Sequence, residues 1–347
     1  MFAKKSEVLH IKISVHSPIP WVGSKKALVP IIISIMPLGC TRYIEPFGGG
    51  ASVLLSKQPD KFEVYNDYNG DLVNMFMVLR DRPLSFFKAA NLFPINSRQE
   101  FSVLKDFLKN NEPDFSGVDR EVGMAYEEFC KVDAEEIEEI LNTKAKMYDV
   151  QRAVAFYKVI RYSYSGTGKS FGGQPVNLPN VLEHIYAVAK RLTNVVIENK
   201  DFEDLIKLHD KPGTFIYLDP PYFMTEDFYT GFSREDHVRL YKCLSNLKYA
   251  KFLLSYNDCE FTKELYNGYT VVETSRLHSM AQRYNAGSQF GELLIANYDI
   301  NERRKNEPVQ LSLFGDDAYE RDYLQDYRYK RPNNHTFYIS QGLKDYR

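Results

Sequence analysis

Short apolar runs alternate with longer amphipathic segments along this chain, and the alternation predicts an α/β fold. Helical patterns follow most of the short runs, as expected of an open sheet with crossover helices. Seven runs have β character and end in polar or turn residues: Tyr43–Glu45, Phe62–Tyr65, Val195–Asn199, Thr214–Leu218, Lys251–Ser255, Tyr269–Glu273 and Glu292–Asn297. We therefore expect a sheet of seven strands.

The interval between the second and third of these runs is too long for a single crossover helix. Helical patterns dominate it, and the acidic stretch Ala134–Leu141 places its apolar residues on one helical face. An inserted helical domain is the simplest interpretation. The expected organisation is a catalytic domain in two pieces, at 1–74 and 195–300, with an insertion at 75–194 and a polar tail at 301–347.

Composition and charge narrow the class of protein without identifying a partner. The chain has 347 residues, of which 26% are charged and 44% hydrophobic, and its formal net charge is −2. These values are typical of a globular protein and exclude disorder throughout. The near-neutral balance neither requires nor excludes nucleic acid, because a local basic groove can coexist with acidic surface elsewhere.

Membrane, disulfide and metal signals are missing from the sequence. The most apolar run near the N-terminus, Leu28–Leu38, contains two prolines and is shorter than the roughly 20 residues that span a bilayer. No signal-peptide pattern accompanies it, so we expect a cytoplasmic protein without a membrane partner. The four cysteines lie singly and the seven histidines show no metal-binding spacing, so we expect neither a disulfide framework nor a metal site.

A glycine-rich turn follows the first predicted strand. The segment Thr41–Leu55 joins a β-rich run to an apolar helical pattern through three consecutive glycines. Because glycine has no Cβ, such a turn lets a ligand approach the backbone closely. A merely tight connection between strand and helix is the alternative.

An acid at the end of the second predicted strand gives the glycine turn more weight. Asp67 follows Gly49 at about the 20-residue spacing at which a carboxylate can accept hydrogen bonds from ribose hydroxyls. The pair predicts a cofactor that carries adenosine; alternatively, Asp67 caps the helix that begins near Asn69. The chain has neither GxGxxG nor GxxxxGK[ST], so a nicotinamide dehydrogenase and a P-loop NTPase are disfavoured.

The run Thr214–Phe223 is the most informative in the chain. Its β-rich half leads into Asp219-Pro220-Pro221-Tyr222, which would stand at the carboxyl end of a strand, where open α/β folds bind ligands. The prolines fix φ and remove two N–H donors, so the carbonyls beside Asp219 are held outward. Carboxylate and carbonyl then form a pair of acceptors that suits an exocyclic amino group, and Tyr222 can stack on a planar base. An ordinary proline turn is the alternative.

Such a pair of acceptors favours methyl transfer to an amino group. The amino nitrogen of adenine is a poor nucleophile because its lone pair is delocalised into the ring. Holding both of its hydrogens reduces the delocalisation and stabilises the positive charge that develops as the nitrogen attacks a methyl sulfonium. Alignment of the reacting atoms adds a proximity effect, and no metal is required.

These motifs resemble those of the D12 class of DNA adenine-N6 methyltransferases, the Dam-like group. The resemblance implies a Rossmann-like seven-stranded methyltransferase sheet with an inserted, mainly helical target-recognition domain. It also implies S-adenosylmethionine as methyl donor and double-stranded DNA as substrate, with the target adenine flipped out of the duplex. The matches extend from about Pro18 to Tyr298 and comprise Trp21–Lys25, Glu45–Leu55, Tyr65–Asn74, Ile160–Gly173, Asn199–Phe202 and Asp219–Tyr222.

The resemblance further implies roles for individual residues. Catalysis falls to Asp219, Pro220 and Tyr222. The ribose is held by Asp67 and the adenine of the cofactor by Asp201, and the full set of cofactor-binding residues is Trp21, Lys25, Glu45, Phe47, Gly49, Asp67, Asp201, Phe202 and Asp219. The DNA-contacting loop at 161–173 supplies Arg161, Tyr162, Lys169 and Ser170.

Two departures from the family pattern put cofactor binding in question. The lysine that usually precedes the tryptophan is Pro20 here, and the final glycine of FxGxG is Ala51, although alanine is small enough to keep the turn. The only tryptophan, Trp21, could instead belong to the core. The 161–173 loop could be a mobile loop without DNA contact.

Three other functions stay open on the sequence alone. Methylation of cytosine N4 uses similar chemistry, and only the resemblance favours adenine. RNA or a protein amide is a less favoured substrate, because related sites there commonly begin with asparagine and lack the insertion. A DNA-binding module that keeps the fold without turnover is the third, and Pro20 and Ala51 are its support.

The polar tail contains one further motif. Gln310-Leu311-Ser312-Leu313-Phe314 resembles the short QLxLF peptides by which bacterial DNA-acting proteins dock on the replication sliding clamp. Three apolar anchors in a polar segment are typical of a peptide that becomes ordered on binding. Packing of these side chains on the protein's own sheet is the alternative. The sequence predicts neither the recognition site on DNA nor the oligomeric state.

Overall fold

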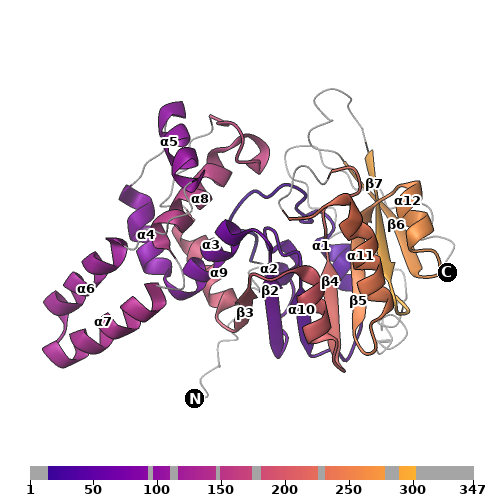
Figure 1. Ribbon diagram of the computed structural model, residues 1–347, viewed down its shortest axis with the longest axis horizontal. Helices are drawn as coiled ribbons and strands as arrows, with labels where there is room; N and C mark the ends of the chain where they lie inside the picture. Colours follow the sequence, from indigo (N-terminus) through magenta and orange to yellow (C-terminus); the bar gives the residue numbers. More distant parts are fainter. Residues whose placement is uncertain are drawn as a thin grey trace, which may run out of the picture. The chain divides into compact units, whose positions relative to one another are not determined.

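The fold is a mixed seven-stranded sheet with helices, seen in a computed structural model that describes residues 15–92, 97–109, 116–145, 149–173, 181–225, 231–277 and 289–301. The strand order is β3-β2-β1-β4-β5-β7-β6 (Figure 1). The strands are β1 (Arg42–Glu45), β2 (Phe62–Asn66), β3 (Val195–Glu198), β4 (Thr214–Leu218), β5 (Lys251–Asn257), β6 (Thr270–Leu277) and β7 (Gln289–Ala296). Each overlaps one predicted run, so the seven predicted strands and the Rossmann-like methyltransferase architecture are confirmed.

Helices fill the long interval between β2 and β3, as the sequence predicts. The helices of this interval are α3 (Gly70–Asp81), α4 (Pro83–Leu92), α5 (Arg98–Lys109), α6 (Ser116–Glu128), α7 (Lys131–Ala145), α8 (Val150–Tyr162) and α9 (Leu182–Leu192). The remaining described helices are α1 (Val29–Ile35), α2 (Ser52–Ser56), α10 (Phe202–His209), α11 (Arg234–Ser245) and α12 (Glu260–Leu265). The acidic stretch 134–141 lies within α7, where Ala134 is buried but Ile140 is half exposed.

Compactness divides the chain differently from the predicted domains. One unit comprises 1–26 and 48–200, and the other comprises 27–47 and 201–347. The first unit holds β2, β3 and α2 to α9, whereas the second holds β1, β4 to β7, α1 and α10 to α12. The predicted boundaries at 74, 194 and 300 were drawn from the motifs and the helical insertion, not from compactness. They remain a prediction about domain organisation.

Helix α8 forms the centre of the first unit. It packs against α3, α4 and α5, and nine of its residues are buried, which is why its sequence is apolar on more than one face. Its first turn is capped by Asp149, whose side chain accepts from the Arg152 amide. Its last turn packs Tyr162 and Val159 against Phe101 of α5.

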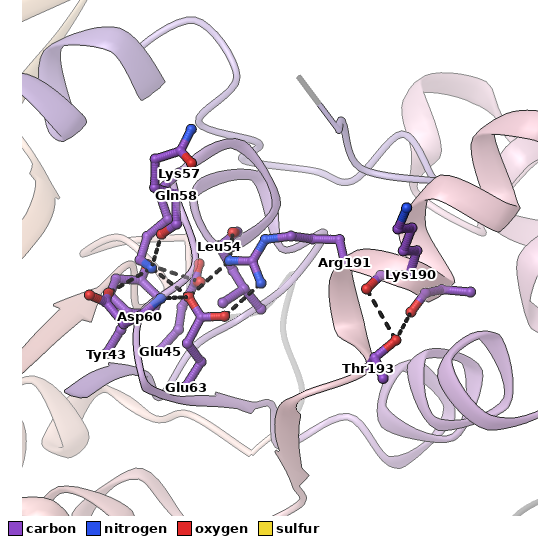
Figure 2. A network of polar contacts seen from close by, with 11 residues as sticks. Tyr43, Glu45, Leu54, Lys57, Gln58, Asp60, Glu63, Lys190, Arg191 and Thr193 are labelled. Carbon is purple, nitrogen blue, oxygen red and sulfur yellow. Dashed lines mark hydrogen bonds and ion pairs between the residues drawn. The ribbon is translucent and has the colours of Figure 1, made fainter. Parts of the chain in front are cut away.

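A buried ion network ties α9 to β2 and α2 within the same unit (Figure 2). The Glu63 carboxylate accepts from Arg191 Nη1 at 2.6 Å and Nη2 at 2.9 Å, and from Lys57 Nζ at 2.5 Å. Arg191 Nη2 also donates to the Leu54 carbonyl at 2.7 Å. Burial raises the pKa of Glu63, but Arg191 and Lys57 outweigh it and hold that pKa below its ordinary value. Helix α9 is thereby anchored to the start of β2, the strand that precedes Asp67.

In the second unit, β1, β4 and β5 run parallel, whereas β5, β7 and β6 pair antiparallel. All five residues of β4 are buried, which accounts for its continuous apolar run. Helix α11 is preceded by Ser233 as its N-cap, with a capping box that Asp236 completes.

Within the described residues, no helix has both the length and the apolar character needed to cross a bilayer. The same part of the chain contains no group of three or more histidine, cysteine or acidic residues arranged to hold a metal ion.

Candidate active site

The glycine turn is built by close backbone contacts in the first unit. The Gly48 amide donates to the Asn66 carbonyl at 2.7 Å, and the Ala51 amide donates to the Gly48 carbonyl at 2.8 Å. A Cβ on Gly48 would lie 2.2 Å from the ring of Tyr65, and a Cβ on Gly49 would lie 2.9 Å from the ring of Trp21. The turn therefore accepts no side chain at either position, and only Gly49 of its three glycines is partly exposed.

Trp21 lies on this turn rather than in the centre of the core. Its indole is partly exposed, covers Gly49 and has the ring of Phe156 at a centroid distance of 6.2 Å. Lys25 follows it and is 3% exposed, with Nζ donating to the Gly23 carbonyl at 2.8 Å. Trp21 thus lies beside the glycine turn, and the cofactor contacts of Trp21 and Lys25 stay a prediction.

Asp67 joins the glycine turn to the start of α3. Its Oδ2 accepts from the Gly49 amide at 2.9 Å, and its Oδ1 accepts from the Asn69 amide at 2.8 Å. The helix cap itself is Asn69, whose side chain accepts from Asp71 and Leu72, so Asp67 is not the helix cap. Burial raises the pKa of Asp67 to about 6, against three backbone N–H groups that lower it.

The Asp67 carboxylate fits a ribose. At neutral pH it is ionised, and its two oxygens have about four lone pairs between them. A carboxylate that already receives three backbone N–H groups can therefore still accept a ribose hydroxyl. The carbonyls of Asp67 and Tyr68 are fixed in turn by the Asn199 amide group, at 2.7 and 3.1 Å. The residues present therefore suit an adenosine-bearing cofactor.

Ala51 is accommodated at the position of the missing family glycine. It is buried and adopts φ 55°, in the left-handed region that glycine favours. The alanine therefore keeps the turn at the cost of backbone strain.

The Asp-Pro-Pro-Tyr turn ends strand β4 in the second unit. Asp219 retains partial exposure, whereas Pro220 and Pro221 are buried. A partly exposed acid thus stands between a buried strand and two buried prolines, and its role in a cradle for an amino group stays a prediction.

Tyr222 is fixed on two sides. Its hydroxyl donates to Glu292 Oε1 at 2.9 Å, and its ring stacks on Tyr256 with a centroid distance of 6.0 Å and an interplanar angle of 18°. The next residue is held by Asn257, which accepts from the Phe223 amide at 3.2 Å and donates to its carbonyl at 3.4 Å. Phe223 also stacks on Phe261 at 4.1 Å.

An aromatic cluster in the second unit carries two of the predicted cofactor residues. Phe47 and Phe202 lie 5.3 Å apart between centroids, and Phe232 packs against both at 5.7 and 5.8 Å. Arg239 lies over Phe202 at 4.2 Å from its centroid. Planar rings of this kind suit contact with a purine.

Asp201 and Glu45 are both engaged by neighbouring side chains. Arg239 donates to both oxygens of Asp201, at 3.1 and 2.8 Å, while Asp201 also caps α10. Glu45 is 2% exposed and accepts from the Tyr43 hydroxyl at 3.1 Å. Neither carboxylate stands apart from the protein, so any contact with a cofactor would share oxygens that already accept.

The predicted DNA loop forms a compact turn after α8. Ser163 and Phe171 form an antiparallel bridge, the Tyr164 amide donates to the Ser170 carbonyl at 2.8 Å, and Lys105 Nζ donates to the Lys169 carbonyl at 2.8 Å. Lys169 and Ser170 are exposed. Their contact with a phosphate or a base edge stays a prediction.

The other two predicted DNA contacts, Arg161 and Tyr162, face the protein. Arg161 is partly buried, and its Nη1 donates to the Pro18 carbonyl at 3.1 Å. Tyr162 is 3% exposed within the cluster around Phe101. Packing of the α8 end against α5 thus leaves Tyr162 almost no surface for DNA, and Arg161 holds the segment before Trp21.

The fold and the two turns define a class, the α/β methyltransferases that act on amino groups. Over residues 21–281 the chain matches the family model described as D12 class N6 adenine-specific DNA methyltransferase, and it belongs to that family. It is thus a site-specific DNA adenine methyltransferase, and the family assigns its target to adenine N6 rather than cytosine N4.

Relatives of full length support this assignment. The chain is 24% identical to the type II methyltransferase M1.LlaDCHI of Lactococcus lactis subsp. cremoris, over 83% of this chain and 97% of the relative. It is 24% identical to the type II methyltransferase M.CviBI of Paramecium bursaria Chlorella virus NC1A, over 81% and 98%. It is 22% identical to the DNA adenine methylase of Haemophilus influenzae, over 85% and 98%.

Sequence reasoning missed two residues and left one motif outside the described structure. Arg239 of α11 gave no signal in the sequence. Glu292 did, because a single acid at the head of the apolar run Glu292–Ala296 is unusual for a buried strand. The Gln310–Phe314 motif lies outside the described residues.

Proposed function

We propose that this protein transfers the methyl group of S-adenosylmethionine to N6 of an adenine turned out of double-stranded DNA, with Asp219 as the catalytic carboxylate. The observation that carries the proposal is the placement of Asp219, which stays partly exposed at the end of β4 between a fully buried strand and two buried prolines. Family membership supplies the reaction class.

The amino group of the target adenine would be activated by two hydrogen-bond acceptors, one for each of its N–H groups. The Asp219 carboxylate accepts one N–H of the adenine amino group, and the Pro220 carbonyl accepts the other, which returns lone-pair density to N6. When bound, S-adenosylmethionine supplies a methyl group on a positively charged sulfur. Asp219 would stabilise the positive charge that develops on N6 as the methyl group passes from sulfur to nitrogen. The sulfonium would leave as the neutral thioether S-adenosylhomocysteine, and N6 would then lose one proton to solvent. Tyr222 offers its ring as a stacking surface for the base.

Cofactor binding is assigned to the glycine turn and its neighbours in the first unit, and separately to the aromatic cluster and its neighbours in the second unit. Asp67 would accept the ribose hydroxyls, the Gly49 backbone would allow close approach, and Trp21 and Lys25 would contact the methionine end. Phe47, Phe202, Glu45 and Asp201 would surround the adenine of the cofactor. Support comes from the bare glycine turn and from the cluster of three phenylalanines.

DNA contact is assigned to the exposed part of the loop after α8. Lys169 and Ser170 would reach phosphates or base edges. Arg161 would act through the segment at Pro18 that it holds, and we leave the buried Tyr162 out of the interface. We also propose that the protein acts in the cytoplasm, in keeping with a DNA substrate.

Removal of the catalytic carboxylate tests the reaction. Asp219→Ala should lower methyl incorporation from tritiated S-adenosylmethionine into DNA by about three orders of magnitude or more, while the free energy of unfolding stays close to that of the wild type. Asp204→Ala, at an exposed acid on α10, is the matched control and should retain activity. Normal incorporation by Asp219→Ala would refute the assignment of Asp219 as the catalytic residue.

Long-read sequencing of modified adenines in cells that express the protein would identify the recognition site on DNA.

We also propose that Gln310-Leu311-Ser312-Leu313-Phe314 docks on the replication sliding clamp. The support is its sequence, three apolar anchors in a polar tail. A pull-down with immobilised clamp should retain the full chain and lose the Leu313→Ala, Phe314→Ala double variant. Equal retention of both proteins would end this idea.

A further inference from the structure

Strand β7 carries a buried acid that the family motifs leave without a role. Glu292 is 0% exposed and stands in the run Gly291-Glu292-Leu293-Leu294-Ile295-Ala296, where every other non-glycine residue is apolar and buried. Removing a carboxylate from water is unfavourable unless it receives hydrogen bonds. An apolar residue at this position could be buried without that free-energy cost. The carboxylate of Glu292 is therefore better explained by a functional role than by a contribution to stability.

The partner of this acid is the aromatic residue of the catalytic motif. Glu292 Oε1 accepts from the Tyr222 hydroxyl at 2.9 Å, and both groups are buried. The sheet places Asn257 of β5 directly opposite Glu292, and Asn257 holds the backbone of Phe223 through two hydrogen bonds. Two facing residues of the sheet thus fix two consecutive residues of the turn after β4.

The ring of Tyr222 is also fixed in its plane. Tyr256, the neighbour of Asn257 on β5, stacks on it, and the Tyr256 hydroxyl is in turn hydrogen-bonded to the buried His237 of α11. A stacked ring can still slide or rotate in its own plane, whereas a hydrogen bond at the hydroxyl removes that freedom. Glu292 therefore supplies the restraint that stacking alone lacks.

We propose that Glu292 is a positioning residue for methyl transfer, which orients the Tyr222 ring against which the target adenine stacks. The inference rests on the proposed function of Tyr222 as that stacking surface. A base that stacks out of register presents N6 to Asp219 at the wrong angle, and a displacement of about 1 Å in such a geometry reduces turnover by as much as 100-fold.

Four variants test this role by steady-state kinetics on plasmid DNA that lacks adenine methylation. Glu292→Leu should lower kcat by about 10- to 100-fold and leave the KM for S-adenosylmethionine within about 3-fold. Glu292→Gln keeps an acceptor for the hydroxyl and should restore kcat to within about 5-fold of the wild type. Tyr222→Phe removes the donor and should reproduce the loss seen with Glu292→Leu. Glu273→Leu, at an exposed acid on the adjacent strand β6, is the control and should behave as the wild type.

The double variant Tyr222→Phe, Glu292→Leu separates positioning from packing. If the two groups act as one unit, its kcat equals that of either single variant, because the shared hydrogen bond is already lost. Losses that multiply, or a fully active Tyr222→Phe, would overturn the proposal. If Glu292→Leu does not fold, the kcat values of Glu292→Gln and Tyr222→Phe still test the positioning role of Glu292.

A further variant distinguishes this inference from the proposed function. Tyr222→Ala removes the whole ring and should lose more activity than Tyr222→Phe. Full activity in Tyr222→Ala would refute the stacking role itself. Loss in Tyr222→Ala together with normal turnover in Glu292→Leu would refute only the positioning role of Glu292.

Discussion

The glycine turn at Gly48–Ala51 and the Asp-Pro-Pro-Tyr turn after β4 are held by different kinds of group. Backbone hydrogen bonds close the first, and neighbouring rings exclude side chains from it. The second has lost two backbone donors to proline, and side chains from β5 and β7 hold it. The first turn should therefore be sensitive to added atoms, and the second to atoms removed from residues outside the motif.

The largest effect is expected when a methyl group enters the glycine turn. In Gly48→Ala the new Cβ meets the ring of Tyr65, which is fully buried and is fixed by its hydroxyl to the Gly49 carbonyl at 2.8 Å. We expect the free energy of unfolding to fall by about 3 kcal/mol, as overpacking of a tight site does. Chemical denaturation measures it. Gly123→Ala on α6, where a Cβ meets nothing, should leave stability unchanged or slightly raised.

Removal of a supporting side chain tests the second turn. Asn257→Ala leaves the Phe223 amide and carbonyl without their partner, so we expect a loss of about 2 kcal/mol in unfolding free energy and a kcat about 10-fold lower. Denaturation and tritiated methyl incorporation measure the two effects. Asn246→Ala, at the exposed end of α11, should change neither. An active, stable Asn257→Ala protein would mean that Phe261 and Glu292 hold the turn without it.

The glycine turn should also respond to pH, because Asp67 couples to it. With its pKa raised to about 6, the carboxylate is ionised at neutral pH and increasingly protonated below that value. A protonated acid accepts ribose hydroxyls less well, so the Kd for S-adenosylmethionine should rise towards tenfold per pH unit below about pH 6. Calorimetry between about pH 5 and pH 8 measures it. A flat profile in the wild type, or the same slope in Asp67→Asn, would contradict the coupling.

The same raised pKa acts on stability with the opposite sign. The folded protein binds the Asp67 proton more tightly than the unfolded chain, whose aspartate has the ordinary pKa of 3.8. This residue therefore favours folding most at low pH and loses that contribution as pH rises through about 6. Above about pH 6, ionised Asp67 is expected to contribute to the binding of S-adenosylmethionine and no longer to the stability of the fold.

The smallest effects are expected from relief of backbone strain. Ala51 and Met224 have φ of 55° and 69°, one in each turn. Met224 is 77% exposed, so Met224→Gly should stabilise the fold by about 1 kcal/mol. Ala51 is fully buried, and loss of its methyl group, worth about 0.8 kcal/mol, should nearly cancel the gain from Ala51→Gly. Thermal unfolding measures the stability of the two variants. Equal stabilisation of Met224→Gly and Ala51→Gly would show that backbone strain alone accounts for the stability change.

Much of the fold could be predicted from the sequence because its helices and strands depend on local sequence patterns. The seven strands, the helical insertion and the capping box at Ser233 each depend on periodicity or on a residue type that only a few backbone conformations favour. Gly49, Asp67 and Asp219 were likewise predictable as candidates, because the backbone freedom of glycine and the fixed φ of proline restrict what such turns can be. Their roles were inferred from chemistry and resemblance.

Only the tertiary structure decided what each of these side chains touches. The Tyr222–Glu292 hydrogen bond joins positions 70 residues apart, and the burial of Tyr162 depends on α5, which the loop motif does not contain. The pairing of Arg239 with Asp201 likewise needs α10 and α11 to pack together. Contacts of this kind arise from chain folding over long sequence distances, and no local pattern in a single sequence encodes them.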